Sequence, residues 1–152
     1  MKVVVMRHGD AVLGADDDAS RALTPVGVAQ SRAMAEWMLT QCPAIDRVLV
    51  SPYLRAQQTW QSMQDLFADA IVETVHDLVP HGHAGPVGDY LRALEGDAKQ
   101  VLVISHLPLV GYLVADLCPG LTPPMFVTSA MAGVEVNAGS GSLLWQQTPQ
   151  RL

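Results

Sequence analysis

Two histidines and two arginines in this sequence have the chemistry needed to handle a phosphoryl group. Arg7-His8-Gly9 and His106 each come directly behind a short apolar run, and Arg55 lies a few residues behind a third. A neutral imidazole can attack phosphorus and become a phosphohistidine, which splits one difficult transfer into two easier ones. Guanidinium groups stay charged and bind phosphate oxygens in a bidentate manner. Gly9 would let the backbone approach a phosphate closely.

The apolar runs are typical of strands buried on both faces of a parallel sheet. They cover residues 3–6, 47–50 and 101–104, and residues 71–75 form a fourth candidate strand. In an open α/β sheet, ligands bind beyond the carboxyl ends of the strands, where helix N-termini also present backbone N–H groups. We therefore expect the two histidines and two arginines to converge on one anion site.

Helical patterns separate the strands. Thr24-Pro25 supplies an N-cap and a proline at the first helical position, and Ser51-Pro52 and Leu107-Pro108 predict two further helix starts of this kind. Residues 85–94 predict a short helix. Near the end, residues 125–136 and 142–145 are β-like and are separated by the hairpin signal 137–141.

This order of elements predicts an α/β fold with three α/β/α layers, a central, mostly parallel sheet and a C-terminal antiparallel hairpin. The 152 residues show no repeat or linker, so one domain spanning 1–152 is expected. A hydrophobic content of 49% with only 16% charged residues excludes a disordered chain and predicts a sizeable core.

Charge and hydropathy exclude several classes of protein. The net charge is −6 and no Lys/Arg run is present, which argues against binding to nucleic acid or to an anionic membrane. No apolar stretch approaches the roughly 20 residues of a membrane span. The apolar run before Arg7 is also shorter than the about 7–15 residues of a signal-peptide core. We expect a cytoplasmic protein.

Metal, nucleotide and thiol chemistry are not expected. His81-Gly82-His83 could suggest a metal site, as could His8 with Asp10, but no third ligand is spaced to complete a tetrahedron. No P-loop is present, which excludes a nucleoside triphosphatase of that type. Cys42 and Cys118 are too few for a disulfide framework, and each is expected near a helix C-terminus, where the dipole disfavours a thiolate. No cofactor is predicted.

These motifs resemble the histidine phosphatase superfamily, which has the Arg-His-Gly signature and includes the cofactor-dependent phosphoglycerate mutases. The similarity is strongest to its small SixA-type branch of protein phosphohistidine phosphatases. The resembling segments span most of the chain; they are residues 6–11, 23–27, 48–59, 101–115, 117–120 and 122–126.

The resemblance implies roles for individual residues. His8 would be the nucleophile that is transiently phosphorylated, and Arg7, Arg55 and His106 would bind the phosphoryl group. Independently of the resemblance, the chemistry of the transfer favours a protonated second histidine, which would stabilise negative charge on the phosphoryl oxygens. Arg21 matches a further pocket arginine of this branch, although a solvated arginine beside the acidic loop 16–18 is nearly as good an interpretation.

Two departures from larger members of the superfamily bear on the substrate. Only a helix, a short strand and a helix fit between residues 51 and 101, so no helical lid is expected, and an open site suits a phosphate on a protein surface. The general acid of larger members has no secure counterpart: Asp77 is in the best position, with His81 and Asp10 as rivals. Without an acid, phosphoramidates should be better substrates than phosphate esters.

The expected function is therefore the dephosphorylation of histidine residues in signalling or phosphotransfer proteins, through a phospho-His8 intermediate and without a metal. The expected partners are these phosphohistidine-bearing proteins, and the chain itself is expected to be a monomer. Two alternatives remain open: a phosphatase of a small phosphorylated metabolite, and a non-catalytic module that binds phosphohistidine. A mutase is disfavoured because an open site retains its product badly.

Overall fold

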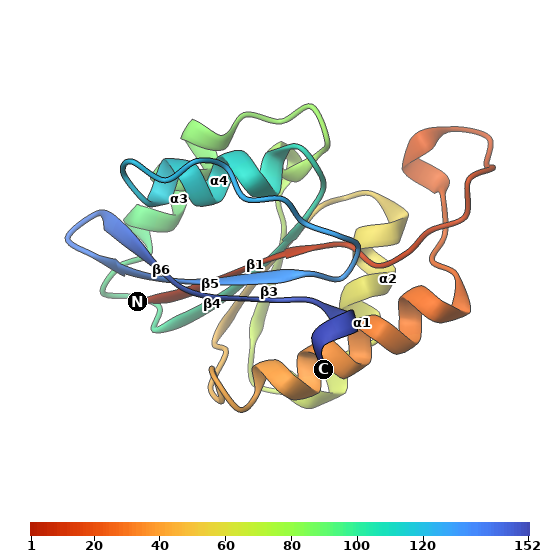
Figure 1. Ribbon diagram of the computed structural model, residues 1–152, viewed down its shortest axis with the longest axis horizontal. Coiled ribbons are helices and arrows are strands. Elements are labelled where there is room, and N and C mark those ends of the chain that lie inside the picture. The colour runs from red at the N-terminus through yellow and green to blue at the C-terminus, as the bar shows by residue number, and fades with distance from the viewer.

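The computed structural model describes residues 1–152, and a six-stranded sheet runs through its middle (Figure 1). The strand order is β3-β2-β4-β1-β5-β6. The first four of these strands are parallel, β5 runs antiparallel to β1, and β6 runs antiparallel to β5. The strands are β1 (Lys2–Arg7), β2 (Arg47–Val50), β3 (Ile71–Thr74), β4 (Gln100–Ser105), β5 (Met131–Asn137) and β6 (Ser140–Gln147).

Four α-helices cover the two faces of the sheet. Helices α1 (Pro25–Met38) and α2 (Leu54–Gln61) lie on one face, and α3 (Ala84–Ala93) and α4 (Leu109–Leu117) lie on the other (Figure 1). Short 3-10 turns complete the chain: η1 (Asp18–Ser20), η2 (Gln64–Phe67), η3 (His76–Leu78) and η4 (Pro149–Arg151). The predicted α/β architecture with its C-terminal hairpin is confirmed.

The central strands divide the apolar interior into two cores. Val3 and Val5 of β1 pack with α3 and α4, whereas Val4 and Met6 pack with α1 and α2. Alternate side chains of a strand point to opposite faces of the sheet, so a strand covered on both sides must be apolar throughout. This requirement explains the uninterrupted apolar runs and fixes where each strand ends.

The helix starts match the sequence patterns only in part. Thr24 caps α1 as predicted: its Oγ1 accepts a hydrogen bond from the backbone N–H of Gly27 at 3.0 Å, and Pro25 is the first helical residue. Helix α2 instead begins at Leu54, after Tyr53, and α4 begins at Leu109, after Pro108. The prediction that Ser51 caps a helix is therefore wrong: the N-cap position of α2 is Tyr53, two residues later, and no side chain caps this helix.

The strand predicted from residue 125 begins only at Met131. Ser129 has a φ of 64°, a left-handed conformation that interrupts an extended chain. The carbonyl of Val127 accepts a hydrogen bond from the N–H of Ala130 at 3.0 Å, which closes a turn ahead of the strand. Residues 125–130 therefore form a loop beside the carboxyl end of β1.

Candidate active site

The chain segments that follow β1, β2 and β4 meet at one edge of the sheet. The backbone N–H of His8 donates to the carbonyl of Ser105 at 2.9 Å, and that of Ser51 donates to the carbonyl of Ile104 at 3.1 Å. These bonds continue the strand pairing one residue beyond β1 and β2. The imidazole rings of His8 and His106 lie 5.0 Å apart between their centroids. The structure thus brings together side chains that are distant in the sequence.

The His8 ring has one nitrogen lone pair, and two hydrogen bonds define where it lies. Nδ1 lies 2.7 Å from the carbonyl oxygen of Gly9, an acceptor, so Nδ1 is the protonated nitrogen. Nε2 faces the Nε–H of Arg55 at 3.3 Å and accepts from it. His8 is only 6% exposed, and this burial, together with the nearby Arg55, lowers its pKa to about 4. His8 is therefore neutral near pH 7, with a lone pair on Nε2.

The Arg7 guanidinium approaches the site from the end of β1. Its Nη1 donates to the carbonyl of Phe126 at 3.0 Å, which ties the loop before β5 to the site. Its Nε is buried and has no hydrogen-bond partner within the protein. Burial and the positive charges of Arg55 and Arg21 lower the pKa of Arg7 below its ordinary value. Arg7 thus has a donor that is available to an anion.

Arg55 lies in the first turn of α2 and is 4% exposed. Besides its bond to His8, it donates from Nη1 to the backbone carbonyl of Asp18 at 2.6 Å and pairs through Nη2 with the Asp18 carboxylate at 3.1 Å. The guanidinium carbon of Arg55 also lies over the aromatic ring of Tyr53, 5.0 Å from the ring centroid. All three nitrogens of this buried cation are therefore in use around the site.

Asp18 also contacts Arg21, so one carboxylate joins two arginines. Arg21 Nη1 lies 3.1 Å from Asp18 Oδ1, and Arg21 Nε donates to the carbonyl of Val12 at 2.7 Å. The hydrogen bonds that Asp18 accepts from Arg21 and Arg55 lower the pKa of its carboxyl group. Asp18 is exposed to solvent, yet its carboxylate pairs with both arginines, because η1 lies in contact with α2. Arg21 is close enough to the site to lower the pKa of His8.

His106 is 1% exposed and lies between two rings, those of His8 and Tyr53. Its Nε2 is 2.6 Å from the Ser51 hydroxyl, and its Nδ1 has no partner within the protein. Burial, together with the positive charge of Arg55 and the neighbouring His8, lowers its pKa to about 2. The expectation of a protonated second histidine is therefore not met here: the imidazole is neutral and can act as a donor only from one nitrogen.

Gly9 is required for packing against α1. A Cβ on Gly9 would lie 2.7 Å from Ser31 Oγ and 2.8 Å from the carbonyl oxygen of Gly27, both in α1. Its N–H donates to Thr59 Oγ1 at 3.0 Å, and Thr59 in turn donates to the carbonyl of Arg55 at 2.7 Å. These contacts hold the segment after β1 between α1 and α2, which gives Gly9 a structural role that differs from the predicted approach to phosphate.

The three candidate general acids are not joined to the site. Asp77 lies exposed in η3, His81 is exposed in the loop that follows, and neither forms a hydrogen bond or ion pair with the site residues. The Asp10 carboxylate accepts from Thr24 Oγ1 at 2.8 Å at the start of α1. No hydrogen bond or ion pair links an acidic side chain other than Asp18 to the site residues.

Features elsewhere in the structure do not compete with this site. No group of three or more His, Cys, Asp or Glu side chains is arranged to hold a metal ion. Cys42 and Cys118 are buried and free, and burial raises the pKa of both thiols. None of the helices has the length and apolarity needed to cross a membrane.

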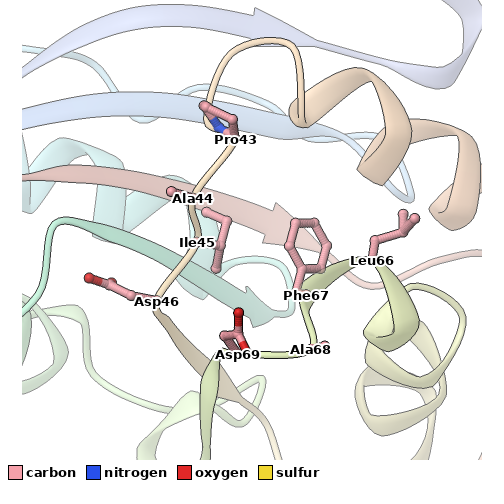
Figure 2. Close-up of a pocket in the computed structure, with 8 residues that line it drawn as sticks. All are labelled: Pro43, Ala44, Ile45, Asp46, Leu66, Phe67, Ala68 and Asp69. Atoms are coloured by element: carbon pink, nitrogen blue, oxygen red, sulfur yellow. The ribbon is translucent and has the colours of Figure 1, made fainter.

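A hollow of about 310 Å³ lies at the other end of the sheet (Figure 2). Residues 43–46 and 66–69 line it, just ahead of β2 and β3, so it is formed at the amino ends of the strands. Its Asp46 carboxylate accepts the backbone N–H groups of Lys99 and Gln100 at 2.9 and 3.2 Å. That carboxylate is therefore occupied in joining strands.

Sequence reasoning missed two residues that complete the site. Asp18 was visible only as part of an acidic run, and nothing in its spacing indicates that it pairs with Arg55. Ser51 was interpreted as a helix cap because it precedes Pro52. Its position directly behind a predicted central strand, level with Arg7 and Ser105, is a signal that could have identified it.

Comparisons with known proteins agree with this geometry. The family model of the histidine phosphatase superfamily (branch 1) matches residues 3–79. Phosphohistidine phosphatase SixA of Escherichia coli (strain K12) is 52% identical over 155 residues, covering 100% of this chain and 96% of that protein. A SixA homolog of Haemophilus influenzae is 35% identical over 156 residues, covering 97% of this chain and 95% of the homolog.

A solved structure has the same fold throughout. The protein histidine phosphatase SixA complexed with tungstate gives a TM-score of 0.95 at 51% identity, covering 99% of each chain. With the matched segment 3–79 containing the Arg7-His8-Gly9 motif and Arg55, the chain belongs to the histidine phosphatase superfamily, branch 1, as a SixA-type member.

Proposed function

We propose that this protein is a phosphohistidine phosphatase that works through a phosphorylated His8. The observation that carries the proposal is a neutral His8 whose ring lies 5.0 Å from that of His106, in a site where two buried nitrogens, Arg7 Nε and His106 Nδ1, have no partner within the protein. Buried polar atoms in folded proteins nearly always have a partner, so unpartnered ones that gather at one place indicate a ligand with acceptor oxygens. A phosphoryl group has three such oxygens.

The reaction follows from the protonation state of His8. Its Nε2 lone pair attacks phosphorus while the bond from phosphorus to the departing group breaks, and the Nδ1 proton stays bonded to the Gly9 carbonyl. Arg7 and Arg55 offset the negative charge of the transferring group. Water then attacks phospho-His8, which releases inorganic phosphate and returns the neutral imidazole.

A phosphohistidine suits this site better than a phosphate ester. An alkoxide leaves badly unless an acid protonates it, and Asp77, His81 and Asp10 form no bond with the site residues. A phosphohistidine that is protonated on its other ring nitrogen departs as neutral imidazole and needs no such acid. The SixA names of the similar proteins support the same substrate class.

We further propose one histidine phosphatase domain over residues 1–152, with an open site. Between β2 and β4 the chain forms only α2, η2, β3, η3 and α3, which leaves no segment for a helical lid. An uncovered site can receive a side chain that is displayed on another folded protein, so signalling or phosphotransfer proteins are the proposed substrates. A monomeric state and a cytoplasmic location stay predictions.

The test measures phosphate release from a phosphohistidine-bearing carrier protein with EDTA present. Rapid release by the parent, little hydrolysis of phosphoserine, whose alkoxide leaves badly without an acid, and no release by the His8→Ala variant are expected. Rapid ester hydrolysis would instead favour a phosphatase of small metabolites with a working acid. Tight binding of the carrier without release would mean a phosphohistidine-binding module.

A further inference from the structure

The Ser51 hydroxyl links His106 of the site to the backbone of Tyr53 at the start of α2. Ser51 is fully buried directly behind β2, and its backbone N–H donates to the carbonyl of Ile104 in β4. Its Oγ lies 2.6 Å from Nε2 of His106 and accepts the N–H of Tyr53 at 3.2 Å. The side chain therefore lies in a rigid position between the second site histidine and the start of α2.

A count of protons and lone pairs decides the direction of the bond between Ser51 and His106. A serine hydroxyl has one proton and two lone pairs, and the N–H of Tyr53 uses one lone pair. If Nε2 of His106 carried the proton, Ser51 would accept twice and its own buried proton would have no acceptor. If Nε2 is bare, the Ser51 proton is donated to it and the hydroxyl is fully used.

The direction of this bond determines what His106 offers to the site. A neutral imidazole has one protonated nitrogen, so a bare Nε2 places the proton on Nδ1. Nδ1 is the buried atom without a partner in the protein. In the opposite tautomer, Nδ1 would present a lone pair instead, and two acceptors would face each other when a phosphoryl oxygen arrives.

We infer that Ser51 is a positioning residue: by donating its hydroxyl proton to Nε2 of His106, it fixes the tautomer that presents Nδ1–H to the transferring phosphoryl group. This role rests on the proposed function for its purpose, but the tautomer itself is a property of the folded protein. The ring packing of Tyr53 against His106, with centroids 5.0 Å apart, holds the imidazole in the plane that this bond requires.

Ser105 provides a matched control. It is also a fully buried serine at the carboxyl end of a central strand and lies next to His106, but its hydroxyl donates to the backbone carbonyl of Leu78 at 2.8 Å. Ser105→Ala removes a buried hydroxyl of the same kind without touching an imidazole. Ser51→Thr keeps a hydroxyl at the tested position.

The decisive measurement is long-range proton–nitrogen NMR of the protein labelled with ¹⁵N-histidine, at pH 7.5, with the His106 signals assigned through a His106→Asn variant. The parent and Ser105→Ala should both show a protonated Nδ1 and a bare Nε2 on His106. Ser51→Ala should show a substantial share of the Nε2–H form, and Ser51→Thr should restore the parent pattern.

Turnover of a phosphohistidine carrier protein gives the second readout. Ser51→Ala should lower kcat/KM roughly tenfold, the fold-change that follows the loss of one net hydrogen bond. Ser105→Ala should stay within about twofold of the parent. Equal losses in the two variants would mean that Ser51 acts only through stability, and would overturn the inference.

The spectrum of the parent keeps the inference falsifiable if Ser51→Ala does not fold. An Nε2–H tautomer of His106 in the parent would overturn it outright, as would a Ser51→Ala protein that holds only the Nδ1–H form. Because the parent spectrum needs no turnover, a protein that fails to hydrolyse phosphohistidine would refute the proposed function while the role of Ser51 is judged separately.

Discussion

Burial of two neutral histidines at the site makes the stability of this protein depend on pH. In an unfolded chain a histidine titrates near pH 6.5. In the folded protein the pKa is about 4 for His8 and about 2 for His106. Between pH 6.5 and 4 the unfolded state therefore binds more protons at these positions than the folded state does, and the difference approaches two protons near pH 5.

The sign and the size of the effect follow from this difference. A depressed folded pKa means that the full stability is present above pH 6.5 and is lost as the pH falls towards the folded values. Each proton changes the free energy of unfolding by about 1.4 kcal/mol per pH unit, so two histidines give a slope of nearly 3 kcal/mol per unit around pH 5. Marginal stabilities of about 5–15 kcal/mol make such a slope easy to detect.

Urea unfolding at a series of pH values between 4.5 and 7.5 measures this slope directly. The parent should lose stability steadily below pH 6.5, and His8→Asn should show about half the slope because one of the two buried imidazoles is gone. A stability that is flat across this window, or a slope that is unchanged in the variant, would refute the conclusion that both site histidines are buried in the neutral form.

Three further perturbations follow from the contacts at and near the site. Asp18→Asn removes the carboxylate that pairs with two arginines, so inorganic phosphate should inhibit about two- to fivefold more tightly. The change is small because an exposed ion pair contributes little free energy, and weaker inhibition would contradict this prediction. A lysine at position 55 cannot donate hydrogen bonds to His8 and Asp18 at the same time, as Arg55 does. In Arg55→Lys, kcat/KM for a phosphohistidine carrier should therefore fall on the order of 100-fold or more, and a loss under tenfold would contradict this. Gly27→Ala would place a Cβ against the backbone carbonyl oxygen of Asp10 and should lower the free energy of unfolding by about 1–3 kcal/mol. Gly85→Ala, which has open space around it, should cost nothing, and equal melting temperatures of the two variants would contradict the packing.

The sequence predicted the placement of the site more successfully than its internal bonding. Strands that are buried on both faces must be apolar, so β1, β2 and β4 were visible as runs, and the sheet's parallel topology then required their carboxyl ends to meet. His8 and His106 could therefore be placed together in advance, as the 5.0 Å between their rings shows.

Loop geometry was the part that the sequence did not reveal. Asp18 reaches Arg55 only because η1 turns the segment after β1 back towards α2, and turns of three residues leave no periodic pattern. The late start of β5 has a similar origin, since Ser129 has a left-handed conformation and hydrogen bonds to Ser31 and His8, which are distant in the sequence. Burial, which lowers the pKa of His106 and keeps it neutral, likewise depends on packing from several elements.

The central claim is that His8 itself carries the phosphoryl group during turnover. Rapid mixing with a phosphohistidine carrier protein, an alkaline quench that preserves phosphohistidine, and mass spectrometry of the digested enzyme test it most directly. The account predicts one phosphoryl group on the peptide containing His8, which forms and decays at rates compatible with turnover and is missing in His8→Ala. Steady phosphate release without any phosphorylated enzyme, or phosphate found on His106 instead, would contradict the account.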